Sequence, residues 1–93
     1  MVIGLAVWEL HLPGCNSLKE KRSVLKSMKD RLHNQFNVSA AETAHHDVHR
    51  QAELAACVVS GDRGHASSVL SALDRFVEGE ARVRIVDSYT TYY

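Results

Sequence analysis

The feature that most constrains the fold is the order in which two hydrophobic periodicities follow one another along the 93 residues. Four segments alternate every two residues or are apolar on both faces, which is typical of β-strands: residues 2–12, 36–43, 51–60 and 82–93. Residues 17–33 and the segment that SGDRGH (60–65) opens instead carry apolar residues at helical spacing. The resulting order predicts one α+β domain over residues 1–93, a ferredoxin-like βαββαβ sandwich. Its four-stranded antiparallel sheet should carry both helices on one face, because crossovers are right-handed.

Short motifs mark where the helices should begin and end. Ser17 is followed three residues later by Glu20, and together they form a capping box. Asp62 or Ser60 can cap the second helix, and Gly79 suits its C-terminal end.

The uncovered face of the predicted sheet is a candidate interface. In the usual strand order of this fold the first and third strands are central, and segments 2–12 and 51–60 are apolar on both faces as central strands are. We expect the face without helices to bear Ala6 and Trp8, with Ala55 or Cys57 beside them. Such a face is too apolar to remain in water, and the simplest partner is a second copy of the chain, bound through this face or an edge strand.

The charge distribution points to a second candidate surface. The formal net charge is zero, yet residues 17–33 hold six Lys and Arg against two acidic residues. A helix places most of these cations along one side, where a row of them can follow a phosphate backbone. We predict nucleic-acid contacts from Lys19, Lys21, Arg22, Lys26 and Lys29. The alternative is that these residues form only the solvated face of an amphipathic helix, since Glu20 and Asp30 interrupt the row of cations. The central strands lack the aromatic pattern that stacks single-stranded bases, so RNA would be bound through its backbone and shape.

A histidine-rich loop is the third candidate. His45, His46 and His49 lie close to Asp47, and imidazole and carboxylate are ligands that zinc, nickel and copper take. No cysteine or distant carboxylate is placed to complete a metal shell, so we expect a polar turn and no cofactor.

Other classes of function find little support in the sequence. Glu9 and His11 share a face of the first strand and could form an acid–base pair, but there is no nucleophile elbow and no P-loop. We therefore expect no enzymatic activity. Cys15 and Cys57 are far apart and are expected to be reduced thiols. The first apolar run is too short to span a membrane and has no basic segment before it, so we expect a cytoplasmic protein with no membrane partner.

Several motifs together resemble one family of small bacterial proteins. LHLPG, SLKEKR, VLKSMKDRL, FNVS, VVSGDRGH and RFVE are similar to the YlxP-like family, over essentially the whole chain. The resemblance implies a ferredoxin-like α+β fold and no established enzymatic activity. Members often sit in genome clusters with transcription-termination and translation-initiation factors and a ribosome-binding factor, which implies RNA or the ribosome as a partner. The residues that match the family pattern are Ser17, Leu18, Lys19, Lys21, Arg22, Asn37, Val38, Ser39, Glu42 and Asp47. His49 stands where many members have an aromatic residue, so the three histidines are particular to this sequence.

Overall fold

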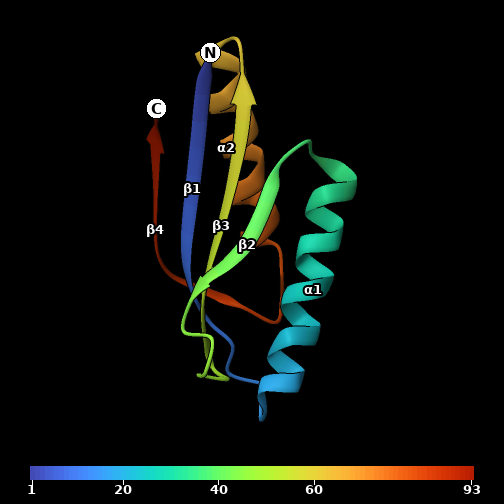
Figure 1. Ribbon diagram of the computed structural model, residues 1–93. Helices are drawn as coiled ribbons and strands as arrows, with labels where there is room; N and C mark the ends of the chain where they lie inside the picture. The colour runs from blue at the N-terminus through green and yellow to red at the C-terminus, as the bar shows by residue number, and fades with distance from the viewer.

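The computed structural model describes residues 1–93 and confirms the predicted order of strands and helices. The elements are β1 (Val2–His11), α1 (Leu18–Gln35), β2 (Ser39–Ala44), β3 (Gln51–Ser60), α2 (Arg63–Glu78) and β4 (Arg84–Tyr92). The strands form one antiparallel sheet in the order β2-β3-β1-β4, so β1 and β3 are central as predicted (Figure 1). The α+β ferredoxin-like fold is therefore confirmed.

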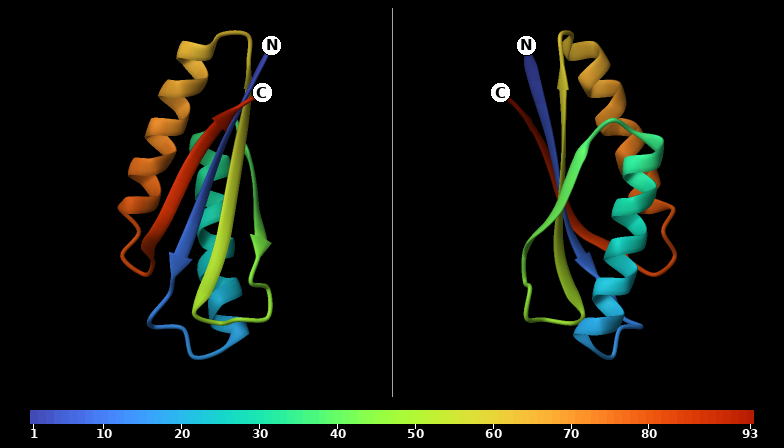
Figure 2. Two further views of the ribbon diagram at one scale, coloured as in Figure 1. Left: turned by 90° about the vertical axis from the view of Figure 1, so that its left-hand side faces the viewer. Right: turned by 45° about the vertical axis from the view of Figure 1, so that its right-hand side comes forward.

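The two helices occupy different parts of one face of the sheet. Helix α2 lies across the central strands, whereas α1 lies farther out, beside the edge strand β2 (Figures 1 and 2). The buried side chains of both helices join those of β1 and β3 in a single hydrophobic cluster. The opposite face of the sheet carries no helix and is exposed.

The helix ends follow the predicted capping chemistry. Ser17 Oγ accepts a hydrogen bond from the amide of Glu20 at 3.1 Å, and Asp62 Oδ2 accepts one from the amide of His65 at 2.8 Å. Gly79 ends α2 in a right-handed conformation (φ −77°), so the position does not use the left-handed freedom of glycine.

The end of α1 differs from the prediction. Phe36 was expected to open the second strand, but its amide donates to the carbonyl of Leu32 at 2.8 Å and closes the last turn of the helix. Its side chain packs against the core. Strand β2 begins only at Ser39, after the chain has left the helix.

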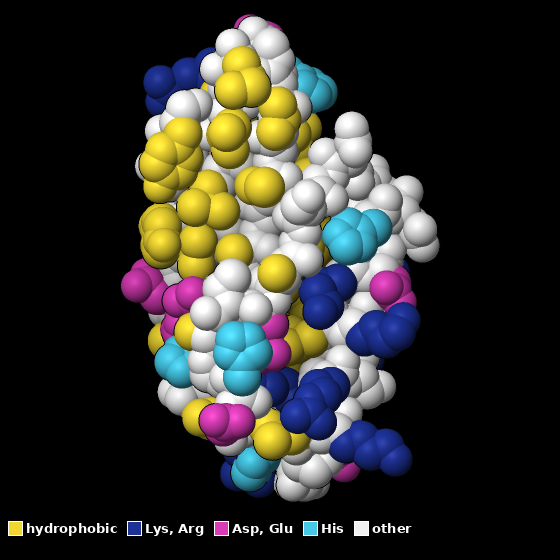
Figure 3. Space-filling view, viewed as in Figure 1, with side chains coloured by type: hydrophobic (Ala, Val, Ile, Leu, Met, Phe, Trp, Pro, Cys, Tyr) yellow, Lys and Arg dark blue, Asp and Glu magenta, His cyan; other side chains and the backbone are white.

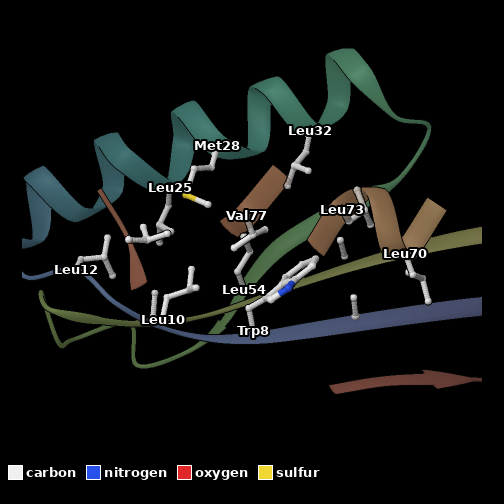
Figure 4. Packing of buried hydrophobic residues seen from close by; sticks show 14 of the residues in the cluster. Trp8, Leu10, Leu12, Leu25, Met28, Leu32, Leu54, Leu70, Leu73 and Val77 are labelled. Carbon is white, nitrogen blue, oxygen red and sulfur yellow. The ribbon is translucent and has the colours of Figure 1, made fainter. Parts of the chain in front are cut away.

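The core lies between the sheet and the helices and is built around Trp8. In β1 the side chains of Ala6, Trp8 and Leu10 alternate onto the helix-facing side, where all three are buried (Figure 4). Trp8 Nε1 donates a hydrogen bond to Asp74 Oδ1 of α2 at 2.8 Å, which satisfies the one polar atom of the indole. The expectation that Ala6 and Trp8 lie on the uncovered face is thus wrong. Both faces of β1 are apolar, and the face that carries the larger side chains, those of Trp8 and Leu10, packs against the helices.

Candidate binding surfaces

The exposed cations of α1 form a row along its solvent side. Lys19, Arg22 and Lys26 are exposed and Lys29 is half-buried, at steps of three and four residues that keep them on one flank of the helix. Figure 3 shows Lys and Arg side chains gathered along α1. We call Lys19, Arg22, Lys26 and Lys29 the basic row.

One member of the basic row is partly neutralised by its neighbour. Lys26 Nζ lies 2.7 Å from Asp30 Oδ2, one helical turn away, and this hydrogen bond lowers the pKa of Asp30. The other three cations form no ion pair within the chain. The second acidic residue of the helix, Glu20, accepts a hydrogen bond from the amide of Asn16 in the cap.

Lys21 does not belong to this surface, and its predicted contact with nucleic acid is wrong. The residue is 0 % exposed. Its ammonium group donates to three backbone carbonyls of the β2–β3 connection, those of His45 at 2.8 Å, Val48 at 2.6 Å and Gln51 at 3.1 Å. Glu42 Oε2 lies 2.8 Å from the same nitrogen. The three donors of the ammonium are used by the carbonyls, so Glu42 serves to neutralise the charge.

This contact ties the β2–β3 connection to α1. Arg50 makes a second contact, to the segment that precedes α1. It donates hydrogen bonds to the carbonyl of Cys15 and to Asn16 Oδ1, each at 3.1 Å. The sequence does contain a signal for the buried position. Lys21 falls on the helical stripe of Leu25, Met28 and Leu32, all of which are buried.

The histidines of the connection face different neighbours. His45 Nε2 lies 2.6 Å from Glu9 Oε1 on β1, whereas His46 Nε2 lies 3.2 Å from the carbonyl oxygen of Glu42. No three His, Cys, Asp or Glu side chains of the chain are grouped as they would be around a metal ion. Glu9 therefore pairs with His45 and not with His11, the partner considered from the sequence.

The uncovered sheet face is divided into an apolar part and an acidic part. The apolar part lies toward the chain termini and includes Val59 and Tyr89, which are 63 % and 59 % exposed (Figure 3). Next to it Glu9 stands directly opposite Glu53 of β3 on one side and Asp87 of β4 on the other. Three carboxylates thus form one row across three strands, which we call the acidic row.

The apolar part of this face is not flat. A depression of about 180 Å³ lies over β2 and β3, bordered by Leu5 on β1. Its lining is otherwise made of small residues: Ser39, Ala40, Ala41, Ala55, Ala56 and Cys57. Both cysteines are free, and Cys57 is half-buried in this depression.

A buried carboxylate holds the turn between α2 and β4 against α1. Glu80 accepts hydrogen bonds from the guanidinium groups of Arg82 and Arg31, and these, Arg82 above all, lower its pKa from 4.5 to about 2. The guanidinium of Arg31 also stacks over the ring of Phe76, with its centre 5.1 Å from the ring centroid. Arg31 is thus occupied by structural contacts and does not extend the basic row.

Comparison with known sequences identifies relatives of this chain. Residues 3–90 match the family described as a protein of unknown function, DUF503. The uncharacterized protein YlxP of Bacillus subtilis (strain 168) is 35 % identical over 86 residues, which cover 88 % of this chain and 94 % of that protein.

None of the helices is both long and apolar enough to cross a membrane.

Two solved structures of designed proteins share the fold. The de novo designed protein Foldit4 has a TM-score of 0.57 at 10 % identity, with 98 % of this chain and 97 % of that chain covered. A designed protein with a ferredoxin fold, LFR1 1, has a TM-score of 0.53 at 17 % identity, with 100 % and 83 % covered. These likenesses concern the fold, whereas the sequence matches identify the relatives. The chain belongs to the YlxP-like family of proteins of unknown function, DUF503.

Proposed function

We propose that this protein is a non-enzymatic accessory factor that binds RNA, free or within the ribosome, through the basic row of α1. The observation that carries the proposal is that Lys19, Arg22 and Lys26 are exposed, with Lys29 half-buried beside them, on one flank of a long helix. A row of cations held at fixed spacing can contact successive phosphates and release their counterions. Lys21, which the structure buries, takes no part.

The rest of the surface favours α1 over the sheet as the RNA-binding side. The acidic row crosses the uncovered face and would repel a phosphate backbone laid over it. Helix α1, which carries the basic row, contains no Phe, Tyr or Trp on which a base could stack. Binding should therefore be driven by backbone contacts and depend weakly on RNA sequence.

The test is a filter-binding titration of a structured RNA at several salt concentrations. The triple variant Lys19→Ala, Arg22→Ala, Lys26→Ala should weaken binding about equally for RNAs of different sequence. It should also reduce the slope of log affinity against log salt by about 2–3, close to one for each phosphate that the variant no longer neutralises.

A matched control removes the same charge elsewhere. Arg63, Arg75 and Arg84 are exposed on α2 and β4, and their combined replacement by Ala should leave most of the affinity. Equal losses of affinity in the two triple variants would show that only overall charge matters, and no loss in the first would remove the proposal.

A second candidate function rests on a different observation, the exposed apolar part of the uncovered sheet face. Large apolar side chains such as Val59 and Tyr89 gather there without a covering element. We propose that this face makes a homodimer, so that the protein acts as an interaction module with or without RNA. Sedimentation equilibrium at about 10⁻⁵ M chain tests this, and a monomer at that concentration would count against it.

A further inference from the structure

The C-terminal end of β3 is open on the side that faces β2. The pairing of β2 with β3 reaches only to Ser39, which lies opposite Cys57. Strand β3 continues to Ser60 and is paired there with β1 alone, while the chain that leads from α1 into β2 diverges from it (Figure 1). The last residues of β3 therefore have a partner strand on one side only.

Val59 presents its backbone to this open side. The amide and carbonyl of Ile3 on β1 bond to Tyr93, on the side of β4. Because successive residues of a strand direct their peptide groups to opposite sides, those of Gly4 face Val58 of β3. The N–H and C=O of Val59 then point away from β1, where no strand is paired with them and no other backbone group bonds to them.

Two hollows adjoin these free peptide groups. One of about 260 Å³ lies toward the helices, and Phe36, His65 and Val69 are in its lining. The other, of about 190 Å³, lies at the start of β2. Asn37 and Val59 line both hollows. Apolar walls with a few convergent polar groups are typical of sites for small planar ligands.

We propose that an unpaired nucleobase of the bound RNA occupies this site, with its Watson–Crick edge on the peptide groups of Val59. The N–H and C=O of one extended residue lie side by side and point the same way. Each of the four bases has a donor next to an acceptor on that edge, so every base can meet this pair. The inference rests on the proposed function and adds one base contact to it, while sequence preference stays weak.

The short length of the open edge favours a base over an added peptide strand. Strand β3 ends at Ser60, and two residues later Asp62 caps α2. An added strand would find only the two free groups of Val59, whereas strand addition relies on a series of main-chain hydrogen bonds. A base needs only two hydrogen bonds. The rings of Phe36 and His65 border the hollow toward the helices and provide surfaces against which a base can pack.

The site lies at the end of α1 toward which the basic row runs. Helix α1 ends at Gln35, six residues after Lys29, which is about 9 Å along the helix axis. This is about the length of three stacked nucleotides of one strand. His33 is exposed between the two, four residues after Lys29. A strand whose phosphates follow the basic row therefore reaches the site with its next nucleotides.

The test compares two RNAs in the filter-binding assay: a fully paired duplex and the same duplex with one unpaired nucleotide. Wild type should bind the second RNA about tenfold more tightly. Val59→Pro removes an N–H that takes no part in the pairing with β1, so the sheet should be kept, as urea unfolding can verify. This variant should bring the affinity ratio close to one and leave the affinity for the paired duplex unchanged.

A second variant leaves the backbone intact. Asn37→Ala combined with His65→Ala changes two exposed side chains of the hollows and should also lower the ratio. The triple variant of the basic row should instead weaken the binding of both RNAs and leave their ratio unchanged.

The amide of Val59 gives a direct readout by hydrogen exchange. It should exchange rapidly in the free chain and become protected when the RNA with the unpaired nucleotide is added. The amide of Cys57, which faces the same side but is paired with Ser39, should be protected in both states and serves as the control. Protection of Val59 by an extended peptide and not by this RNA would overturn the proposal and make the site an edge for strand addition.

The outcomes separate the base site from the proposed function. A wild-type chain that binds neither RNA overturns both. If wild type binds the two RNAs equally and the triple variant of the basic row loses affinity for both, the base site is overturned and the basic row stands.

Discussion

The ammonium group of Lys21 lies 2.8 Å from Glu42 Oε2, and this buried ion pair joins helix α1 to the edge strand β2. Three carbonyl oxygens of the β2–β3 connection complete the surroundings of the lysine. Lys21, which the sequence suggested as part of a binding surface, therefore has a structural role. Its side chain holds the histidine-containing β2–β3 connection and the edge strand β2 against α1.

Replacing Lys21 should cost far more stability than replacing any cation of the basic row. Lys21→Met keeps the aliphatic chain but leaves three carbonyls without their donor and Glu42 without its counter-charge, and should lower the free energy of unfolding by about 3 kcal/mol. Lys19→Met, at an exposed position of the same helix, should change it by less than about 0.5 kcal/mol. Urea unfolding of both variants checks this, and similar losses of stability would contradict the structural role.

The sequence was sufficient for the fold because the fold depends on periodicity. The runs that are apolar on both faces in β1 and β3, and the helical stripe of α1, predicted the order of the elements. Ser17, and either Ser60 or Asp62, marked where the helices begin, and the structure uses Ser17 and Asp62 as the caps. The end of α1 was missed because Phe36 is apolar and suits either a strand or the last helical turn. Its hydrogen bond to Leu32 decides between them, and periodicity does not report such a bond.

The surfaces were harder to predict because they depend on which face of each element turns inward. Both faces of β1 are apolar, so the pattern could not say that Ala6 and Trp8 face the helices. The charge of Lys21 suggested that it belongs to the nucleic-acid-binding surface, although its spacing from Leu25 places it on the buried stripe of the helix. The pairing of Glu9 with His45 joins positions far apart in the chain and left no local signal.

His45 should carry backbone strain that a matched pair of variants can isolate. Its φ of 63° is the one positive value in the chain, a region that residues with a Cβ atom disfavour, although Asn, Asp and His adopt it more often than the others. His45→Ala and His45→Gly both remove the imidazole that contacts Glu9, but only glycine relieves the strain. His45→Gly should therefore be more stable than His45→Ala by about 1 kcal/mol.

His46 provides the control for this comparison. Its φ is not positive, so glycine gains nothing there and brings greater backbone entropy in the unfolded state. The order should reverse, with His46→Gly equal to or less stable than His46→Ala in the same denaturation measurement. The same order at both positions would mean that the left-handed conformation of His45 costs nothing.

Glu80 should make stability depend on pH in the acid range. Its pKa falls from 4.5 to about 2 on folding because Arg82 and Arg31 donate hydrogen bonds to the carboxylate. A lowered pKa means that the stabilisation is fully present above about pH 4.5 and is lost as the pH falls toward 2. The two arginine side chains are 43 % and 47 % exposed, so water screens the interaction and a loss of about 2 kcal/mol is expected.

Two glutamine variants show whether the acid loss belongs to this carboxylate. Glu80→Gln should be less stable than wild type near neutral pH and should lose less stability on acidification. Glu78→Gln, at an exposed residue of α2 that forms no ion pair, should follow the wild-type profile. Urea unfolding at several pH values gives the curves, and identical slopes for Glu80→Gln and wild type would exclude Glu80 as the source.

The ion pair between Lys26 and Asp30 offers a test of RNA binding in which affinity rises. Asp30 Oδ2 holds Lys26 Nζ at 2.7 Å and adds a negative charge beside the basic row. Asp30→Asn should free the lysine for phosphate, strengthen RNA binding and increase the salt slope by up to about one. Lys26→Ala should have the opposite effect on both quantities. Asp87→Asn changes the charge equally on β4, away from α1, and should leave RNA affinity nearly unchanged. If Asp30→Asn and Asp87→Asn strengthened binding to the same extent, the gain would come from net charge alone and the basic row would not be the contact surface.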